Sequence, residues 1–502
     1  MHHIFNTILQ KTSFINFLSR FWAFIILLWL SQLLACQEPE SKQKVVPDLQ
    51  VSENKRYLTY QDGNPFFWLG GTSWGMSEWL SREEIELYLD NRKEKGFNLI
   101  QICLFWGKRT EDPVNFQANQ PNFYGFKAFQ EKEGITKPTE PLQISGGTPQ
   151  NSNDYWDHVK FILSEAKERN MIVAIMPVWG RRYVNNAHPP FSSALFSVTD
   201  MFDYGKFLGS LLEEYTNIIW VMGGDVQADK NGDFLGHYRS MAEGIIFGLT
   251  GKKAKWNERS PLWNQALMTY HPDGVPLLNS SKWFHKDAWL DFNMIETFKH
   301  RDQIYQAVQQ DYDLKDPIKP TVMGEPAYEW SPTNKETTQA IHMRRQAYQS
   351  YFAGAAGFTY GGFRDDKGNG PLFSPTNNWE TTLDWEGAQS MKWVRAFCTT
   401  HFWPTWKPIS NIFSSDPGSG ELQKVAVLAG KEILIYFPEN SSAELDLKDL
   451  FTENRQLQLN WYNPVNGTLQ QQSEEFVEAI LIEVTPPEDW EDAILVISEK
   501  VG

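Results

Sequence analysis

Two acidic residues, each preceded by glycine, end apolar runs that are typical of buried strands. Asp225 ends "NIIWVMGGD" and Glu325 ends "TVMGE", and continuous apolar runs favour parallel strands covered on both faces. If both strands belong to one barrel, the two carboxyl groups face each other across its mouth. An opposed Asp/Glu pair suits glycoside hydrolysis, in which one group protonates the leaving oxygen and the other attacks the anomeric carbon or activates water. We interpret the glycines as room for a substrate to approach the backbone.

Other roles for these carboxylates must be weighed against catalysis. Carboxylates at strand ends also cap the following helix or pair with a nearby arginine, and this is an alternative for each residue taken alone. Because Asp225 and Glu325 fall at the fourth and seventh predicted strand ends, a catalytic pair is favoured. Glu329 is a rival nucleophile, but it lies further from the strand than Glu325 and is assigned to the loop.

Aromatic and polar residues at the other predicted strand ends suit a sugar site. Aromatic rings pack on the C–H faces of a sugar, and polar groups bind its hydroxyl groups. For each tryptophan the alternative is packing at the rim of the barrel, and for the histidine it is a satisfied place in a loop. The candidate substrate-binding residues are Trp74, Trp106, Trp179, His271, Asp273, Tyr328 and Tyr360.

Alternating strand-like and helix-like segments predict the scaffold that positions these residues. Ser81 and Glu84 have the spacing of a capping box, and Gly96 ends the helix that they begin. Eight strands alternating with helices predict an α/β fold, a (β/α)₈ or TIM barrel, within residues 51–405. The predicted strands are 66–71, 98–106, 171–179, 217–225, 266–272, 291–298, 320–326 and 356–362.

The pattern of the chain changes near residue 406. Short strands such as "EILIYFP" and "AILVIS" are separated by turn residues, and no helix signal follows. This predicts a small antiparallel β-sandwich over residues 406–502. We expect this domain to be a packing module, with ligand binding as the alternative.

Residues 1–36 have the features of a lipoprotein signal peptide. Lys11 and Arg20 precede the apolar run "WAFIILLWL", which is too short to span a bilayer comfortably. "LLAC" resembles a bacterial lipoprotein cleavage box, which implies that Cys36 becomes the lipidated first residue of the mature chain. The polar residues 37–50 predict a flexible tether. We therefore expect an exported outer-membrane lipoprotein, at the cell surface or the periplasmic face, with an uncleaved N-terminal anchor as the alternative.

Composition narrows the range of partners. A formal net charge of −16 argues against nucleic acid as a partner, because phosphate binding requires a basic face. Besides Cys36, only Cys103 and Cys398 are present; Cys103 lies in a strand-like run, which favours two free buried thiols over a disulfide. No cluster shows metal-ligand spacing, and no cofactor is expected. The 21 tryptophans suit either sugar stacking or a large core, and nothing indicates the oligomeric state.

Ordered blocks across residues 50–500 resemble the apiosidase-like glycoside hydrolases, a family 140-like barrel. The blocks include "RYLTYQDGNPFFWLGGTSWG", "NIIWVMGGD", "TYHPDG", "GEPAYE" and "GFTYGG". The resemblance implies a retaining glycosidase with Asp225 as acid/base and Glu325 as nucleophile. It also implies action on plant or algal polysaccharide side chains, notably apiose in pectin. The C-terminal "LNWYNPVNGTLQ" resembles the small domain, named for collagen binding, that commonly accompanies this barrel.

Two departures from the family pattern bear on the sugar. Gly71 stands where the family usually has Asp, and the block at Glu296 reads "ETFKH" where the family usually has a Gln-Ser-Gly-His-like ending. We expect both near the mouth, so apiose is not assumed. The alternatives are a glycosidase or transglycosylase with another sugar specificity, and a non-catalytic glycan-binding lipoprotein. A retaining pair predicts carboxyl groups about 5–5.5 Å apart, and an inverting pair about 6.5–9.5 Å.

Overall fold

The computed structural model describes most of the chain from residue 47 onward. The described ranges are 47–107, 119–133, 135–185, 195–333, 336–448, 450, 455–477 and 481–499. The predicted signal peptide and Cys36 lie outside these ranges. Strand β1 (Leu49–Val51) begins inside the stretch for which the sequence predicts a tether. Within the described ranges, every helix is too short or too polar to cross a bilayer.

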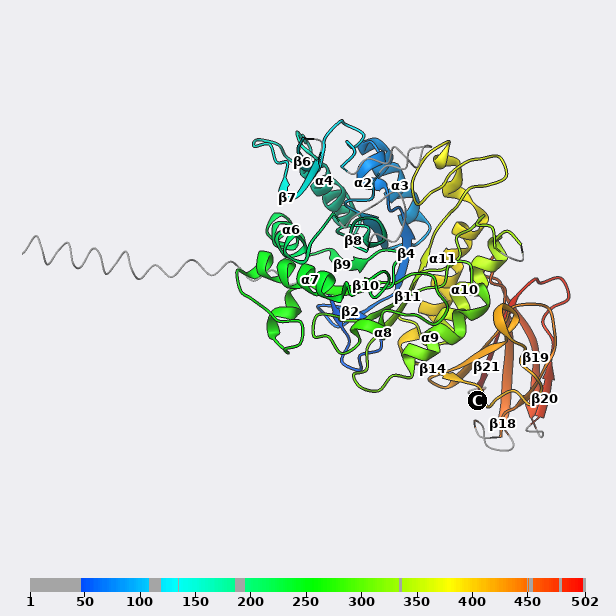
Figure 1. Cartoon of the computed structure of the whole chain (residues 1–502). Helices are drawn as coiled ribbons and strands as arrows, with labels where there is room; N and C mark the ends of the chain where they lie inside the picture. Colours follow the sequence, from blue (N-terminus) through cyan, green and yellow to red (C-terminus); the bar gives the residue numbers. More distant parts are fainter. Residues whose placement is uncertain are drawn as a thin grey trace, which may run out of the picture. The chain divides into compact units, whose positions relative to one another are not determined.

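Eight parallel strands form a nearly closed barrel, as the sequence predicts (Figure 1). Their order is β10-β9-β8-β5-β4-β13-β12-β11, and all are buried because the barrel interior covers one face and helices cover the other. A hydrogen bond joins the two ends of the sheet: Thr269 Oγ1 in β10 donates to the backbone carbonyl oxygen of Phe292, just before β11, at 2.7 Å. The strands are β4 (Trp68–Thr72), β5 (Leu99–Cys103), β8 (Ile172–Met176), β9 (Ile218–Gly223), β10 (Leu267–His271), β11 (Asn293–Glu296), β12 (Thr321–Glu325) and β13 (Gly357–Tyr360).

Helices follow the barrel strands. The predicted capping box is present: Ser81 Oγ accepts from the Glu84 amide at 3.2 Å, and the Glu84 carboxylate accepts from the Ser81 amide at 2.7 Å. The helices are α2 (Met76–Trp79), α3 (Arg82–Glu94), α4 (Tyr155–Glu168), α5 (Gly180–Tyr183), α6 (Val198–Leu211), α7 (Leu235–Thr250), α8 (Ser281–Phe284), α9 (Ile304–Tyr312), α10 (Ala340–Phe352) and α11 (Glu386–Thr400).

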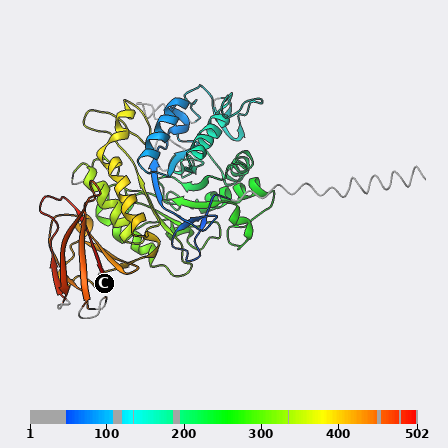
Figure 2. The same cartoon turned by 180° about the vertical axis from the view of Figure 1, so that it is seen from behind.

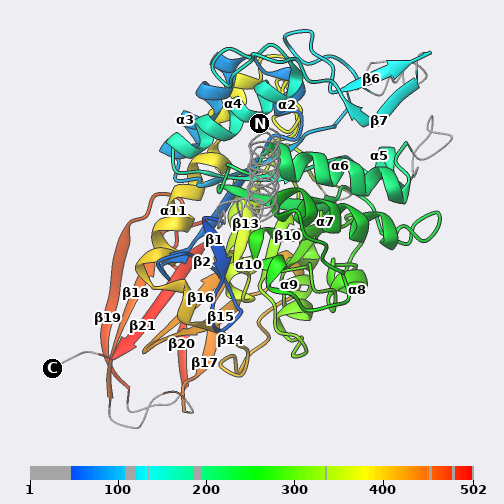
Figure 3. The ribbon, with the colours of Figure 1, turned by 90° about the vertical axis from the view of Figure 1, so that its left-hand side faces the viewer.

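Two small sheets accompany the barrel. Strand β1 pairs with β2 (Leu58–Tyr60), which pairs with β3 (Pro65–Phe66). The polar insertion after β5 contains a hairpin of β6 (Phe129–Lys132) and β7 (Ile135–Pro141), which lies beside α6 (Figure 3). Cys103 and Cys398 are both free and buried, as predicted.

The C-terminal part is the predicted antiparallel β-sandwich. One layer has six strands in the order β14-β15-β16-β21-β18-β19, and the other pairs β17 with β20. The strands are β14 (Trp406–Ile409), β15 (Val425–Ala429), β16 (Glu432–Phe437), β17 (Ala443–Asp446), β18 (Arg455–Tyr462), β19 (Leu469–Val477), β20 (Leu481–Val484) and β21 (Ala493–Glu499).

Three strands of the six-stranded layer, β15, β16 and β21, are buried on both faces. In β16, Ile433 and Ile435 pack into the core of the sandwich, whereas Leu434 and Tyr436 pack into the core of the barrel. This division explains why the run "EILIYF" is apolar throughout instead of alternating. Residues Val46–Gly502 accordingly form one compact unit, in which α10 lies against β14, β15 and β16 (Figure 2).

A buried ion pair joins the two parts of this unit. Arg344 on α10 and Asp492, just before β21, are both fully buried, with Arg344 Nη2 2.9 Å from Asp492 Oδ1. The Tyr436 hydroxyl donates to the other oxygen of Asp492 at 2.9 Å. The pair therefore places charge at a junction that apolar side chains otherwise dominate.

Replacing Arg344 with Met is expected to lower the free energy of unfolding by about 3–5 kcal/mol, because Asp492 is left buried without its counter-charge. Urea unfolding followed by fluorescence measures the change. The double variant Arg344→Met/Asp492→Leu should recover much of the loss. Lys448→Ala, which breaks the exposed pair with Asp446, serves as control and should change the free energy of unfolding little. Equal losses in Arg344→Met and the control would contradict this account.

Candidate active site

A left-handed turn presents Asp225 directly after β9. Gly223, Gly224 and Asp225 have φ values of 93°, 115° and 46°, and a non-glycine residue with positive φ is strained and typical of functional sites. A Cβ atom at Gly223 would lie 2.2 Å from the His271 carbonyl oxygen. A Cβ atom at Gly224 would lie 2.7 Å from Met176 Sδ. These glycines permit the turn and its packing; the sequence-based interpretation, room for a substrate, is wrong here.

Glu325, unlike Asp225, is itself the last residue of its strand, β12. The glycine before it is also closely packed, since a Cβ atom at Gly324 would lie 2.6 Å from Met294 Cγ. In the neighbouring strand β11, Glu296 pairs in register with Glu325. The backbone amide of Thr297 donates to the Glu325 carbonyl oxygen at 2.9 Å. The ends of β11 and β12 therefore hold two carboxyl groups side by side.

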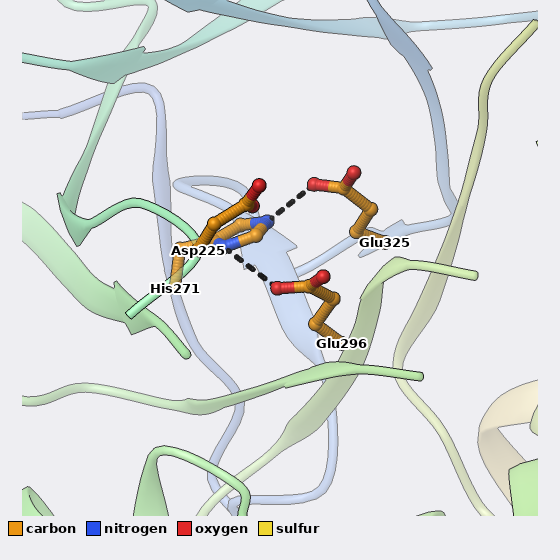
Figure 4. Close-up of side chains that lie close together, drawn as sticks. All are labelled: Asp225, His271, Glu296 and Glu325. Carbon is orange, nitrogen blue, oxygen red and sulfur yellow. Dashed lines mark ion pairs between the residues drawn. The ribbon is translucent and has the colours of Figure 1, made fainter. Parts of the chain in front are cut away.

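Four side chains from four successive strand ends converge at the C-terminal end of the barrel (Figure 4). They are Asp225 after β9, His271 from β10, Glu296 from β11 and Glu325 from β12. One oxygen or nitrogen atom from each lies within 4.8 Å of those from the others. The fold thus brings Asp225 and Glu325 together, as their places at two strand ends predict.

His271 lies at the centre of this cluster and is completely buried. Its Nε2 is 2.9 Å from Glu325 Oε2, and its Nδ1 is 3.0 Å from the Pro272 carbonyl oxygen. A carbonyl and a carboxylate both accept hydrogen bonds, so this geometry favours a proton on each ring nitrogen. Burial alone would lower the pKa of His271, but the hydrogen bond and charge of Glu325, with the charge of Asp225, raise it. When protonated, His271 places a positive charge 2.9 Å from Glu325.

Asp225 is the least buried member of the cluster, with 24% of its side chain exposed. Desolvation, followed by the negative charge of Glu325, raises the pKa of Asp225 to about 7. Arg181 opposes this rise, with its Nη1 3.7 Å from Asp225 Oδ2. A carboxyl group with this pKa can hold a proton near neutral pH and give it up during a reaction.

Aromatic side chains line the cluster. Trp74 donates from Nε1 to the Tyr328 hydroxyl at 3.1 Å, and its ring meets His271 edge-on at a centroid distance of 5.4 Å. Burial and the charge of Glu325 raise the pKa of the Tyr328 phenol well above its usual value. The ring centroids of Trp179 and Trp74 lie 5.3 Å apart. The structure therefore brings Trp74, Trp179 and Tyr328 to the catalytic candidates.

The remaining predicted sugar contacts take different positions. Asp273 is half-buried just beyond β10, close enough for its charge to act on Asp225 and Glu296. The ring centroid of Trp106 lies 4.2 Å from that of Trp179. Among the aromatic pairs of the described residues, Trp106 contacts neither Trp74 nor His271. Trp106 consequently forms the outer part of the aromatic wall.

The prediction for Tyr360 is wrong. Tyr360 is completely buried, and its hydroxyl donates to Glu329 Oε2 at 2.6 Å. It pairs in register with Gly71 of β4, and both face α3, since a Cβ atom at Gly71 would lie 3.4 Å from Arg92 Cδ. The two-residue alternation of strands therefore turns Tyr360 towards the helices. The departure at Gly71 also lies on this outer side and not at the mouth.

Glu329 belongs to this outer region and not to the cluster. Its Oε1 accepts a hydrogen bond from the Gly387 amide at 3.0 Å, and its other oxygen accepts from Tyr360. Both oxygens are thus occupied in joining the loop after β12 to α11 and to β13. The structure assigns the rival nucleophile a role in packing.

Sequence reasoning missed two charged members of the site, Glu296 and Arg181. Glu296 ends the short sixth strand and was noted only as a departure from the family pattern. Arg181 follows Trp179 at the third strand end, where the sequence analysis predicts only the tryptophan as a site residue. In both cases the available signal was the same one that identified Asp225: a charged residue at a predicted strand end.

The cluster also meets the distance requirement of a metal site, and it is the only such group within the ranges that the structure describes. Local spacing along the chain does not reveal it, because the four side chains come from four strands. However, His271 Nε2 and Glu325 Oε2, two atoms that an ion would need, lie 2.9 Å apart and face each other. This contact favours acid–base chemistry over metal binding at the cluster.

A (β/α)₈ barrel with an Asp and a Glu opposed at its C-terminal strand ends is the arrangement of a glycoside hydrolase. Residues 52–405 match the model of the apiosidase-like catalytic domain. The chain belongs to the apiosidase-like family, and its activity class is that of the glycoside hydrolases. Residues 409–498 match a second family model, named for the collagen-binding domain of a collagenase.

Solved structures similar to this chain share its fold. A glycoside hydrolase is 24% identical with a TM-score of 0.72, covering 90% of this chain and 97% of the other. A glycoside hydrolase family 5 protein from Bacteroides vulgatus is also 24% identical, with a TM-score of 0.70 and coverage of 90% and 93%. A comparison with curated protein sequences gave no significant match.

Proposed function

We propose that the protein is a retaining glycoside hydrolase in which Glu325 is the nucleophile and Asp225 the acid/base. The observation that carries this proposal is the approach of the two carboxyl groups, whose nearest oxygens lie within 4.8 Å. This supports the separation of about 5–5.5 Å in retaining enzymes over the about 6.5–9.5 Å of inverting ones.

The proposed reaction is a double displacement. In the first step, Asp225 gives its proton to the leaving oxygen while a Glu325 oxygen attacks the anomeric carbon and forms a glycosyl ester. In the second step, Asp225 removes a proton from water, and that water displaces Glu325 from the anomeric carbon. His271 and Tyr328 hold Glu325 in position and stabilise its charge before attack and after release.

The expected substrates are plant or algal polysaccharide side chains, in particular those of pectin. Membership of the apiosidase-like family supports this proposal, and apiose is one candidate sugar. The aromatic wall formed by Trp74, Trp179 and Trp106 suits a sugar ring. Export and lipid attachment at Cys36, at the outer membrane, are part of the proposal and rest on the sequence alone.

The stereochemistry of the first product tests the mechanism. A panel of aryl glycosides, including β-apioside, identifies a substrate, and proton NMR then follows the anomeric signal during hydrolysis. We expect the first-formed sugar to have the same anomeric configuration as the substrate. Initial formation of the opposite anomer would disprove the double displacement, and failure to cleave both the panel and pectic oligosaccharides would contradict the proposed function.

A further inference from the structure

Glu296 is a buried carboxyl group that the proposed mechanism does not use. Only 4% of its side chain is exposed, and its Oε2 has no hydrogen-bond partner among the residues that the structure describes. Its other oxygen is packed closely, since a Cβ atom at Gly274 would lie 2.8 Å from Oε1. Leaving such a group unpaired costs free energy, so an unsatisfied carboxyl group requires an explanation.

The neighbouring histidine does not satisfy Glu296. His271 Nδ1 is 3.7 Å from Glu296 Oε2, too long for a hydrogen bond. That nitrogen instead lies 3.0 Å from the Pro272 carbonyl oxygen, and Nε2 faces Glu325. Glu296 Oε2 points towards the His271 ring (Figure 4), and it lies within 4.8 Å of an oxygen of Asp225 and of Glu325.

The surroundings of Glu296 favour its protonated form. Desolvation, followed by the negative charges of Asp225 and Glu325, raises the pKa of Glu296 well above its usual value. Asp273 acts in the same direction, and Arg181 opposes it. A protonated carboxyl group has an O–H donor as well as an acceptor. Glu296 can therefore either donate a hydrogen bond to a hydroxyl group or accept one from it.

Geometry relates Glu296 to one part of the sugar. Its oxygen lies within 4.8 Å of that of Glu325, and a nucleophile reacts with its target from about 3–3.5 Å. A sugar whose anomeric carbon meets Glu325 can therefore place the hydroxyl on the adjacent carbon, the 2-hydroxyl, beside Glu296. Contacts to this hydroxyl group strengthen in the transition state of glycoside hydrolysis.

We propose that Glu296 is a specificity-determining residue that hydrogen-bonds the 2-hydroxyl group of the sugar held between Asp225 and Glu325. This inference rests on the proposed function. It restricts the substrates to sugars with a free 2-hydroxyl group. It also explains why a buried carboxyl oxygen has no hydrogen-bond partner among the described residues, beyond its long ion pair with His271.

A double-mutant cycle on the substrate and the enzyme tests the inference. Wild type, Glu296→Gln and Glu296→Met are assayed on the best aryl glycoside, on its 2-deoxy analogue and on another monodeoxy analogue as control. Glutamine keeps hydrogen-bonding ability and length, whereas methionine keeps only length. We expect Glu296→Met to lower kcat/KM on the parent glycoside about 10–100-fold and Glu296→Gln about threefold or less.

The cycle is decisive because it cancels the higher intrinsic reactivity of 2-deoxy glycosides. The kcat/KM ratio of parent to 2-deoxy substrate should fall at least about tenfold from wild type to Glu296→Met, while the ratio to the control analogue should not change. An unchanged 2-deoxy ratio, or equal losses in the Gln and Met variants, overturns the inference. Failure of the proposed function looks different, since wild type would then cleave none of the glycosides. Thermal unfolding verifies that each variant is folded.

Discussion

Glu325→Gln should reduce kcat on an activated aryl glycoside by about 10⁴-fold or more, because a neutral amide cannot attack the anomeric carbon as a carboxylate does. Affinity for the substrate should persist, since glutamine has the same size and the aromatic wall is intact. Initial rates and the single-turnover burst of the aryl leaving group measure the effect. A second variant, Glu325→Ala, opens space for azide, which should restore turnover and give a glycosyl azide of inverted configuration.

Glu329→Gln is the matched control for this prediction. Glu329 is a glutamate four residues further along the chain, and it is also buried, but it contacts Tyr360 and Gly387 instead of the cluster. We expect kcat to stay within about threefold of wild type and the free energy of unfolding to fall by about 1–3 kcal/mol, because an amide cannot accept both hydrogen bonds equally well. Equal loss of turnover in Glu325→Gln and Glu329→Gln would contradict the assignment of Glu325 as the nucleophile.

Asp225→Asn should lower activity by an amount that depends on the leaving group. A poor leaving group needs protonation, so its kcat/KM should fall about 10²–10⁴-fold, which is the usual contribution of general acid catalysis. A dinitrophenolate leaves without a proton, so the first step on that substrate should change little, and the glycosyl-enzyme should accumulate. Leaving-group series and burst kinetics measure both effects. A uniform loss across leaving groups would argue against the acid role.

The pH dependence provides a second measure of the same residue. Asp225 acts as an acid only when protonated, and its pKa is raised to about 7. The active form therefore dominates below that pH, and kcat/KM should decline as the pH rises through about 7. On a substrate with a poor leaving group, the residual kcat/KM of Asp225→Asn should lack this alkaline limb, whereas wild type and Glu329→Gln should show it. Persistence of the limb in Asp225→Asn would assign it to another group.

The barrel and its two principal carboxylates were predictable because the relevant signals are local. Each apolar run is long enough to identify a strand, and a barrel places every strand end at the same face. Asp225 and Glu325 could therefore be paired across the chain without any knowledge of contacts. The capping box of Ser81 and Glu84 followed in the same way from spacing alone.

The rest of the site depends on packing that the sequence does not display. Tyr360 was misplaced because strand ends alternate between the two faces, and a strand of four residues leaves the phase of that alternation undetermined. The protonation of His271 depends on a carbonyl and a carboxylate from different segments. The packing around Gly223 and Gly224 likewise comes from other strands, so the turn could not be distinguished from open space for a ligand.

The six-stranded layer, with apolar side chains on both faces, has a consequence for how this protein can be divided. Residues such as Leu434 and Tyr436 would meet water if the barrel were expressed alone or if the C-terminal part were grafted elsewhere. A chain truncated near residue 405 should therefore aggregate. The shared hydrophobic interior also requires that the barrel and the C-terminal sandwich be kept together. The catalytic segment is, in this sense, not modular.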